Sequence, residues 1–424
     1  MLKLIIYPLF IFLIITSCKH RNEEVYFSIQ DPNVRNALRK DVDEKREIIK
    51  NNIKELSLST FKRNENLIEY EEKLENLYIN NPNTKRILFM DWFRKSAIDI
   101  STLSKFNELQ TLDLSSKWNN ELPDNFSDLV NLDSLKLSMD NLITLPNALS
   151  FLKDLKYLHI DCKNLETFDK KSLNLPSLRT LIISDISENL KLSNELDSLD
   201  QLECLSFRGI SNVPASIASM KKIEYLELNG VEVIPKEIEK IDQLKVLEIT
   251  DCGSVIALNE FENLVSLKIT NSDIDNLHFT NRMKSLKFLH LSDLDSIPKG
   301  IGELSNLQFL ILERVNLGHL YGDIVNASEI CHIALRNCHN ADSLSLPSFF
   351  KDFPSLVELD LYSNKLESIP EDIFHSKSLR LINFSSEKRL NIPDNYLKRD
   401  NIFFTNSVNN GFEYNNGKRD LNSY

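Results

Sequence analysis

Two cysteines and two histidines lie close together near residue 335, and their types suggest a metal site. They are Cys331, His332, Cys338 and His339. Thiolate and imidazole are the ligands that zinc prefers in tetrahedral sites. However, Cys331 and His332 are adjacent on a predicted strand, so their side chains point to opposite faces. An extended chain from residue 331 to 338 also covers roughly 20 Å, whereas zinc ligands lie within about 2.3 Å of one ion. We therefore predict no metal site.

The other sequence patterns that could do chemistry predict no catalytic or cofactor site either. Gly300-Ile301-Gly302 is a lone G-x-G. The sequence contains no G-x-G-x-x-G, G-K-[ST], H-E-x-x-H or G-x-S-x-G. After Cys18, the remaining 5 of the 6 cysteines are scattered singly, which is not typical of a disulfide framework. We therefore predict that the protein is not an enzyme, that it needs no cofactor, and that it acts by binding.

A repeated pattern supplies the elements that would position binding residues. The pattern L-x-x-L-x-L starts at Leu109, Leu132, Leu155, Leu178, Leu202, Ile223, Leu244, Leu264, Leu286, Leu307, Ile330, Leu356 and Leu379. The 270 residues from the first start to the last, divided by 12 intervals, give 22.5 residues per repeat. Alternating apolar residues predict a short strand with one buried face. A unit this short cannot close a core alone, so stacked units must share a core under a parallel sheet.

The second half of many repeats contains a branched residue followed by proline, as in Leu122-Pro123, Ile234-Pro235 and Ile369-Pro370. Proline cannot donate a ladder hydrogen bond and therefore turns the chain out of the sheet. With both halves present, the sequence resembles the leucine-rich-repeat family over about residues 84–396, in the subtype with a leucine- or isoleucine-proline step. The resemblance implies an α/β right-handed solenoid with a curved parallel sheet on its concave face. The family's asparagine at the ninth repeat position is matched by Asn364, whereas other repeats carry Lys163, Cys252, Ser272 or Cys338 there.

The regions flanking the repeats differ from them. Residues 18–83 are predicted to hold the anchor and a helical N-terminal cap, because Asp31-Pro32 is a favourable helix start. Apolar residues then recur at helical spacing, and a second helical stretch runs near residues 66–78. Residues 397–424 are predicted to be a C-terminal cap and a polar tail, the latter from about Asn406.

The first 17 residues are typical of a signal peptide. Lys3 precedes an apolar run from Leu4 to Ile15, which is too short to span a bilayer. The run ends in Ile15-Thr16-Ser17-Cys18, which resembles the lipobox of bacterial lipoproteins. The resemblance implies cleavage before Cys18 and acylation of that cysteine, and Lys19 lacks the Asp of inner-membrane retention. We therefore expect an anchor in the bacterial envelope, with the outer membrane favoured. The alternative is an ordinary secretory signal with an incidental cysteine.

The formal net charge is −12. Binding of nucleic acid requires a basic face, and a polybasic contact with anionic lipid requires one too. We therefore predict no nucleic-acid partner and membrane attachment through the lipid alone.

Strand positions between the leucines should face the concave side in this family. We expect Phe288, Phe309 and Ile311 to be solvated there, with His290 beside them, and contiguous exposed apolar surface often marks a binding site. Cover by a loop, by the cap or by self-association is an alternative, and aromatic residues also simply stabilise cross-strand pairs. Glu227 and Glu248 should be cross-strand neighbours, with Lys268 next to them. The full predicted ligand-binding set is Tyr225, Glu227, Glu248, Phe288, His290, Phe309, Ile311, Glu313, His332 and Arg336.

We therefore expect a membrane-anchored recognition protein that binds a protein, or a glycan as the second candidate, on its concave face. A structural envelope protein making homotypic contacts is the first alternative. An enzyme with an unrecognised site is the second. The oligomeric state is left open.

Overall fold

The computed structural model describes residues 78–91, 100–168, 171–184, 190, 192, 195–253, 258, 260–274, 277–317, 324–338, 350, 353–362, 364, 371–384, 403–408 and 411–414. The chain divides into two compact units, Met1–Ser57 and Leu58–Tyr424. The described residues all belong to the second unit. Cys18, the signal segment and the predicted cap helices up to residue 77 therefore lie outside them.

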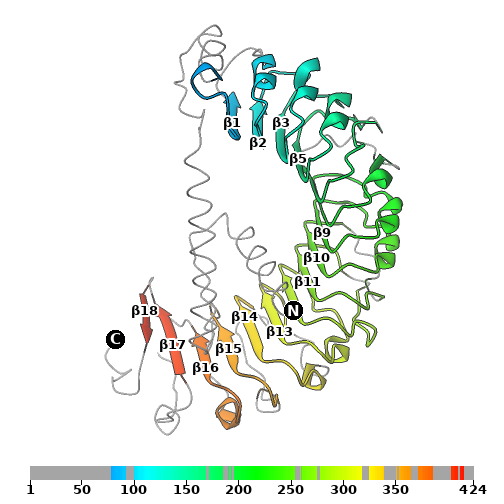
Figure 1. The fold of residues 1–424 in the computed structure, drawn as a ribbon. Helices are drawn as coiled ribbons and strands as arrows, with labels where there is room; N and C mark the ends of the chain where they lie inside the picture. Colours follow the sequence, from blue (N-terminus) through cyan, green and yellow to red (C-terminus); the bar gives the residue numbers. More distant parts are fainter. Residues whose placement is uncertain are drawn as a thin grey trace. The chain divides into compact units, whose positions relative to one another are not determined.

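The described part of the second unit is built around one sheet of 16 strands, in which every pairing is parallel except the last. In Figure 1 the strands form a curved sheet on the inner side of the stacked repeats, and the 3-10 turns lie on their outer side. The strands are β1 (Arg86–Asp91), β2 (Thr111–Ser116), β3 (Ser134–Met139), β5 (Tyr157–Asp161), β7 (Thr180–Ser184), β8 (Cys204–Arg208), β9 (Tyr225–Asn229), β10 (Val246–Thr250), β11 (Ser266–Thr270), β12 (Phe288–Ser292), β13 (Phe309–Glu313), β14 (His332–Arg336), β15 (Glu358–Leu361), β16 (Leu381–Phe384), β17 (Phe403–Val408) and β18 (Gly411–Tyr414).

The leucines of the repeat form the core beneath this sheet. In β9, for example, Leu226 and Leu228 are fully buried, whereas Tyr225, Glu227 and Asn229 face the other side and keep part of their surface exposed. The buried side chains of all the described repeats join into one continuous cluster. Burial of one leucine stabilises a fold by about 1.5–3 kcal/mol. The predicted stacking is confirmed, because one shared hydrophobic core runs beneath neighbouring repeats.

The proline steps begin the outer segments as expected. Pro123, Pro146, Pro214 and Pro235 each precede a 3-10 helix, with φ between −65° and −75°. The 3-10 helices are η2 (Ser101–Lys105), η3 (Asp124–Asp128), η4 (Asn147–Phe151), η5 (Glu195–Ser198), η6 (Ala215–Ser219), η7 (Lys236–Lys240), η8 (Ile301–Glu303), η9 (Ile324–Asn326) and η11 (Glu371–His375). A second, two-stranded sheet joins β4 (Thr144–Leu145) to β6 (Thr167–Phe168).

Seven consecutive strands, β8 to β14, are each followed by one residue in the left-handed region. Its amide N–H donates to a carbonyl at the end of the next strand, as in Arg314 N to Arg336 O at 2.9 Å, or, for Asn337, to the residue just after that strand, Tyr362. A non-glycine residue in this conformation costs roughly 1–2 kcal/mol, and the inter-repeat hydrogen bond offsets part of that cost. The residues are Gly209, Gly230, Asp251, Asn271, Asp293, Arg314 and Asn337, with φ between 42° and 75°.

The ninth position of the repeat, where the family has asparagine, is buried as expected in one repeat and exposed in another. Asn364 accepts from Cys338 N at 2.8 Å and donates to Leu335 O and Leu361 O. In the repeat of β5, however, Cys162 is buried while Lys163 is exposed. No left-handed residue separates β5 from Cys162. The residue that points into the core is therefore the eighth of this repeat, Cys162, and not the ninth, Lys163.

The sheet continues beyond the predicted repeat boundary at residue 396. β17 pairs in parallel with β16, and β18 pairs with β17 in the antiparallel direction. The segment predicted to become a polar tail from about Asn406 therefore contains strand structure. Paired strands satisfy the backbone groups of this Asn-rich segment despite its polar side chains.

Candidate functional site

Concave-facing residues on neighbouring strands form straight rows across the sheet, because the strands are parallel and in register. One row, here called the aromatic row, contains Phe288, Phe309, His332 and Glu358 on β12, β13, β14 and β15. The ring centroids of Phe288 and Phe309 lie 6.4 Å apart, and those of Phe309 and His332 lie 6.0 Å apart. Both phenylalanines are half-buried. The rings therefore form one apolar strip that keeps some contact with solvent.

The neighbouring row toward the strand ends contains His290, Ile311, Ala334 and Asp360. The prediction that Ile311 is solvated is wrong, because its exposed fraction is 7%. Ile311 lies between Phe309 and Glu313 on the same face of β13 and is the register partner of His290 and Ala334. Contact with a ligand at this position stays a prediction.

His332 is 6% exposed, and its two ring nitrogens have different surroundings. Its Nδ1 lies 3.3 Å from Glu358 Oε2. Its Nε2 is buried without a hydrogen-bond partner, as is Nε2 of His290. An unmade hydrogen bond of a buried polar group costs about 1–3 kcal/mol. The site therefore contains two polar atoms whose bonding capacity is unused.

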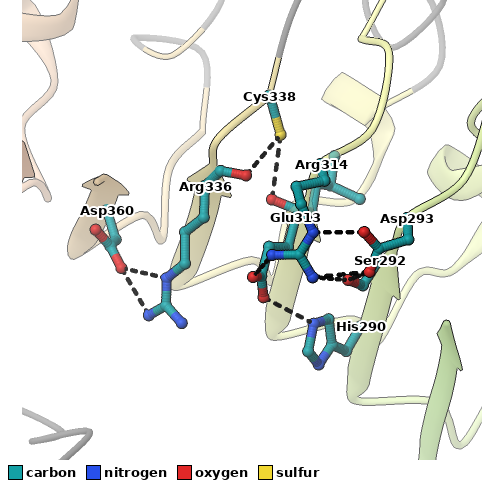
Figure 2. A network of polar contacts seen from close by, with 9 residues as sticks. His290, Ser292, Asp293, Glu313, Arg314, Arg336, Cys338 and Asp360 are labelled. Atoms are coloured by element: carbon teal, nitrogen blue, oxygen red, sulfur yellow. Dashed lines mark hydrogen bonds and ion pairs between the residues drawn. The ribbon is translucent and has the colours of Figure 1, made fainter. Parts of the chain in front are cut away.

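A charged network borders the strip (Figure 2), where Glu313 lies between His290 and Arg314. Arg314 forms ion pairs with Glu313 and Asp293 and donates to Ser292 Oγ at 3.1 Å. The His290 imidazole, whose Nε2 is 3.8 Å from Glu313 Oε2, and the Arg314 guanidinium together lower the pKa of Glu313 to about 2. Burial lowers the pKa of His290. At neutral pH the network therefore holds an ionised Glu313 beside a neutral imidazole.

A second ion pair lies on the same side of the strip, toward the strand ends, where Arg336 is the register partner of Glu313. Arg336 donates from Nε to Asp360 Oδ2 at 2.8 Å, and its Nη2 is 2.7 Å from the same oxygen. Asn383 Nδ2 donates to Asp360 Oδ1 at 3.0 Å. The Asp360 carboxylate is buried, so these contacts are needed to compensate its charge.

The predicted residues Tyr225, Glu227 and Glu248 form a separate group on β9 and β10. Glu227 accepts two hydrogen bonds from Arg208, at 2.9 and 2.8 Å. Glu248 is the register partner of both Glu227 and Lys268, as expected. Burial raises the pKa of Glu248 to about 7, although Lys268 opposes the shift. Burial also raises the pKa of Tyr225.

The structure thus brings together Phe288, His290, Phe309, Ile311, Glu313, His332 and Arg336 on three adjacent strands. It adds four residues that the predicted set lacked: Asp293, Arg314, Glu358 and Asp360. Glu358 and Asp360 follow the strand frame and were recognisable as concave-facing from the sequence. Asp293 and Arg314 occupy the left-handed turns, and the leucine pattern gives no signal for these.

The cysteines first considered as metal ligands contact backbone carbonyls. Cys331 Sγ lies 3.4 Å from Gln308 O, and Cys338 Sγ lies 3.2 Å from Leu312 O. Burial raises the pKa of both thiols, that of Cys338 to about 11. His339 lies outside the described residues, and within those residues no group of three or more metal-ligating side chains occurs.

Comparisons with known proteins bear on the fold. No family model matches the chain. It is 23% identical to adenylate cyclase of Schizosaccharomyces pombe over 307 residues, which are 72% of this chain and 17% of the cyclase. It is 32% identical to lumican of Coturnix japonica over 154 residues, which are 33% of this chain and 42% of lumican. The chain therefore spans less than half the length of either relative.

Two solved structures resemble the chain. One is a leucine-rich-repeat protein of Leptospira interrogans, with a TM-score of 0.60 and 22% identity over 78% of this chain and 85% of that one. The other belongs to the Toll–Spätzle complex of Drosophila, with a TM-score of 0.51 and 18% identity over 75% of this chain and 52% of that one. Together with the register of the sheet and its leucine core, these likenesses show that the chain has the leucine-rich-repeat fold.

Proposed function

We propose that the protein is a bacterial recognition lipoprotein that binds a protein ligand on its concave face, centred on β12 to β14. The observation that carries this proposal is the aromatic row, in which two half-buried phenylalanines in register adjoin an almost buried histidine. Aromatic side chains surrounded by polar groups are typical of binding hot spots.

The polar surroundings of the row support recognition because they are already ordered. Glu313, Arg314 and Asp293 form one group of ion pairs along the strand-end side of the row, and Arg336 and Asp360 continue that side over β14 and β15. A ligand that meets side chains held in place loses less conformational entropy than one that must order them. The structural likeness to a chain of the Toll–Spätzle complex, whose name describes a protein–protein assembly, favours a protein ligand over a glycan.

Photo-crosslinking tests the binding face. A photoreactive phenylalanine analogue would replace Phe288 or Phe309 in cells that make the protein. It would also replace Phe151, which is 60% exposed and lies on η4 rather than on the concave strands. We expect the same protein adduct from both concave positions and none from Phe151. Adducts from Phe151 alone, or from no position, would refute the assignment.

The identity of the adduct distinguishes the alternatives. A crosslink between two copies of the chain would favour a structural protein with homotypic contacts. A crosslinked glycan would replace the protein ligand. For an identified partner, the Phe288→Ser, Phe309→Ser double variant should weaken binding by at least about tenfold, since each hot-spot residue contributes 2 kcal/mol or more, while the circular dichroism spectrum is unchanged.

Anchoring through Cys18 is the second part of the proposal, and it rests on the lipobox-like sequence. No helix in the described part of the chain has the length and apolar character needed to cross a membrane. Metabolic labelling with an alkyne fatty acid should label the wild type and not Cys18→Ala. Digestion by an impermeant protease in intact cells would place the concave face outside the cell, and digestion only after lysis would place it in the periplasm.

A further inference from the structure

The aromatic row contains a carboxylate, that of Glu358, at its β15 end. Its contact partner differs from those of the other two carboxylates of the site. Glu313 pairs with the guanidinium of Arg314, and Asp360 pairs with that of Arg336. Glu358 instead meets the imidazole of His332, and its side chain is 23% exposed. Strands lie about 4.8 Å apart, so Glu358 is roughly 10 Å from Phe309 across the sheet. The row therefore presents two aromatic rings, an imidazole and a carboxylate in a straight line.

The surroundings of His332 indicate which kind of ligand group would complement the aromatic row. A carboxylate only accepts hydrogen bonds, so a hydrogen bond across the 3.3 Å contact between His332 Nδ1 and Glu358 Oε2 requires the proton on Nδ1. A carboxylate at one ring nitrogen fixes the tautomer in this way. Nε2 is then a bare acceptor, and it is buried and without a partner. Nε2 of His332 and the Glu358 carboxylate are both hydrogen-bond acceptors, so the ligand group that complements them is a hydrogen-bond donor.

The wider charge of the chain agrees with a cationic donor. The formal net charge is −12, which attracts a basic partner over long distances. Phe309 lies next to His332 in the row, with its ring centroid 6.0 Å from the imidazole, so the apolar surface of the row begins two strands from Glu358. The apolar surface of Phe288 beside it suits an apolar side chain.

We propose that the ligand of the aromatic row presents a lysine or arginine next to an apolar residue, with the cation at Glu358 and the apolar side chain on Phe309 and Phe288. This proposal rests on the proposed function, because it names the chemistry of the protein partner for the same face. Glu358 and Phe309 act as specificity determinants, and His332 lies between them in the row, with Nδ1 at Glu358 and with a buried, unpaired Nε2.

Selection from a random 12-residue peptide library on the full-length protein tests the proposal. We expect peptides selected on the wild type to be enriched in Lys or Arg adjacent to Leu, Phe or Trp. Selection on Glu358→Gln should lose this enrichment, because Gln keeps the size of the side chain and an acceptor for His332 Nδ1 but removes the charge. Asp113→Asn is the matched control, since Asp113 lies on β2 of the same sheet.

Calorimetry with one selected basic peptide then gives the size of the effect. The peptide should bind Glu358→Gln at least about tenfold more weakly than the wild type, as truncation of one partner of a close charge pair does, and should bind Asp113→Asn within about twofold. Neutral or acidic consensus peptides, no enrichment, or equal binding to Glu358→Gln would each overturn the proposal. If photo-crosslinking still identifies a partner at Phe288 and Phe309, the proposed function survives and only the cationic assignment fails.

Discussion

The substitution Glu248→Gln should stabilise the protein at alkaline pH and have no effect at acid pH. Burial raises the pKa of Glu248 from 4.5 to about 7 in the folded chain. The folded state therefore binds this proton more tightly than the unfolded state does. The stability contributed by the protonated carboxyl is fully present below pH 4.5 and is lost as the pH rises through about 7. Glutamine resembles the protonated carboxyl at every pH.

The size of the effect follows from the shift. One pKa unit corresponds to 1.36 kcal/mol, so about 2.5 units give roughly 3 kcal/mol, the largest gain in unfolding free energy expected for Glu248→Gln above pH 7. Repeat proteins need not unfold in one step. Urea unfolding at pH 4, 6 and 8 should therefore be accompanied by hydrogen exchange of the β9 to β11 amides.

The neighbouring carboxylate provides the control. Glu227 accepts two hydrogen bonds from Arg208, so Glu227→Gln should destabilise at pH 8, by about 1 kcal/mol, because Arg208 is 41% exposed and water screens the pair. A stability difference for Glu248→Gln that does not change between pH 4 and pH 8, or a variant less stable than the wild type at pH 8, would refute the reasoning about burial.

Three further predictions concern the fold. Burial lowers the pKa of His159 to about 4, so the wild type should lose roughly 3 kcal/mol as the pH falls from 6.5 to 4; His159→Gln should flatten this part of a melting-temperature profile. Gly300→Ala should cost more than the roughly 1–2 kcal/mol of a left-handed alanine, since its Cβ would lie 2.3 Å from Phe279 O, whereas Gly209→Ala meets no atom within 4 Å; equal urea midpoints would contradict this. Asn364→Ala removes two hydrogen bonds between repeats and one within its own repeat and should cost about 3 kcal/mol, measured by urea unfolding; a loss under 1 kcal/mol would show that water replaces them.

The strands and the core could be predicted from the sequence because each depends on a local pattern. The alternation of Leu226 and Leu228 with polar residues is enough to place β9 and to decide which face is buried. Parallel register follows from the alignment of the L-x-x-L-x-L pattern in neighbouring repeats, so the row from Phe288 to His332 was also predictable.

The detailed environment of the site depended on features that the pattern does not contain. Ile311 is buried although its position is a concave one, and the leucine pattern, which gives only the face of each residue, carries no information on this burial. The ion pairs of Arg314 require a left-handed turn, and arginine is not a residue from which such a turn would be predicted. The strands from Phe403 onward lie in a polar sequence with no leucine alternation to mark them.

The seven left-handed turns have a consequence for how the length of the sheet can change. Each turn makes the same backbone contact with the next repeat, so one repeat can be exchanged for another as a cassette. Val246 and Ser266 are register partners and differ by 20 positions. Deletion of residues 246–265 would join Lys245 to Ser266 and place β11 beside β9. The backbone groups at the junction would then keep the register in which neighbouring strands form their hydrogen bonds. Glu227 would then lie beside Lys268 instead of Glu248. A genetic deletion or duplication of one unit would thus shorten or lengthen the recognition surface and change its charge pattern in a single event.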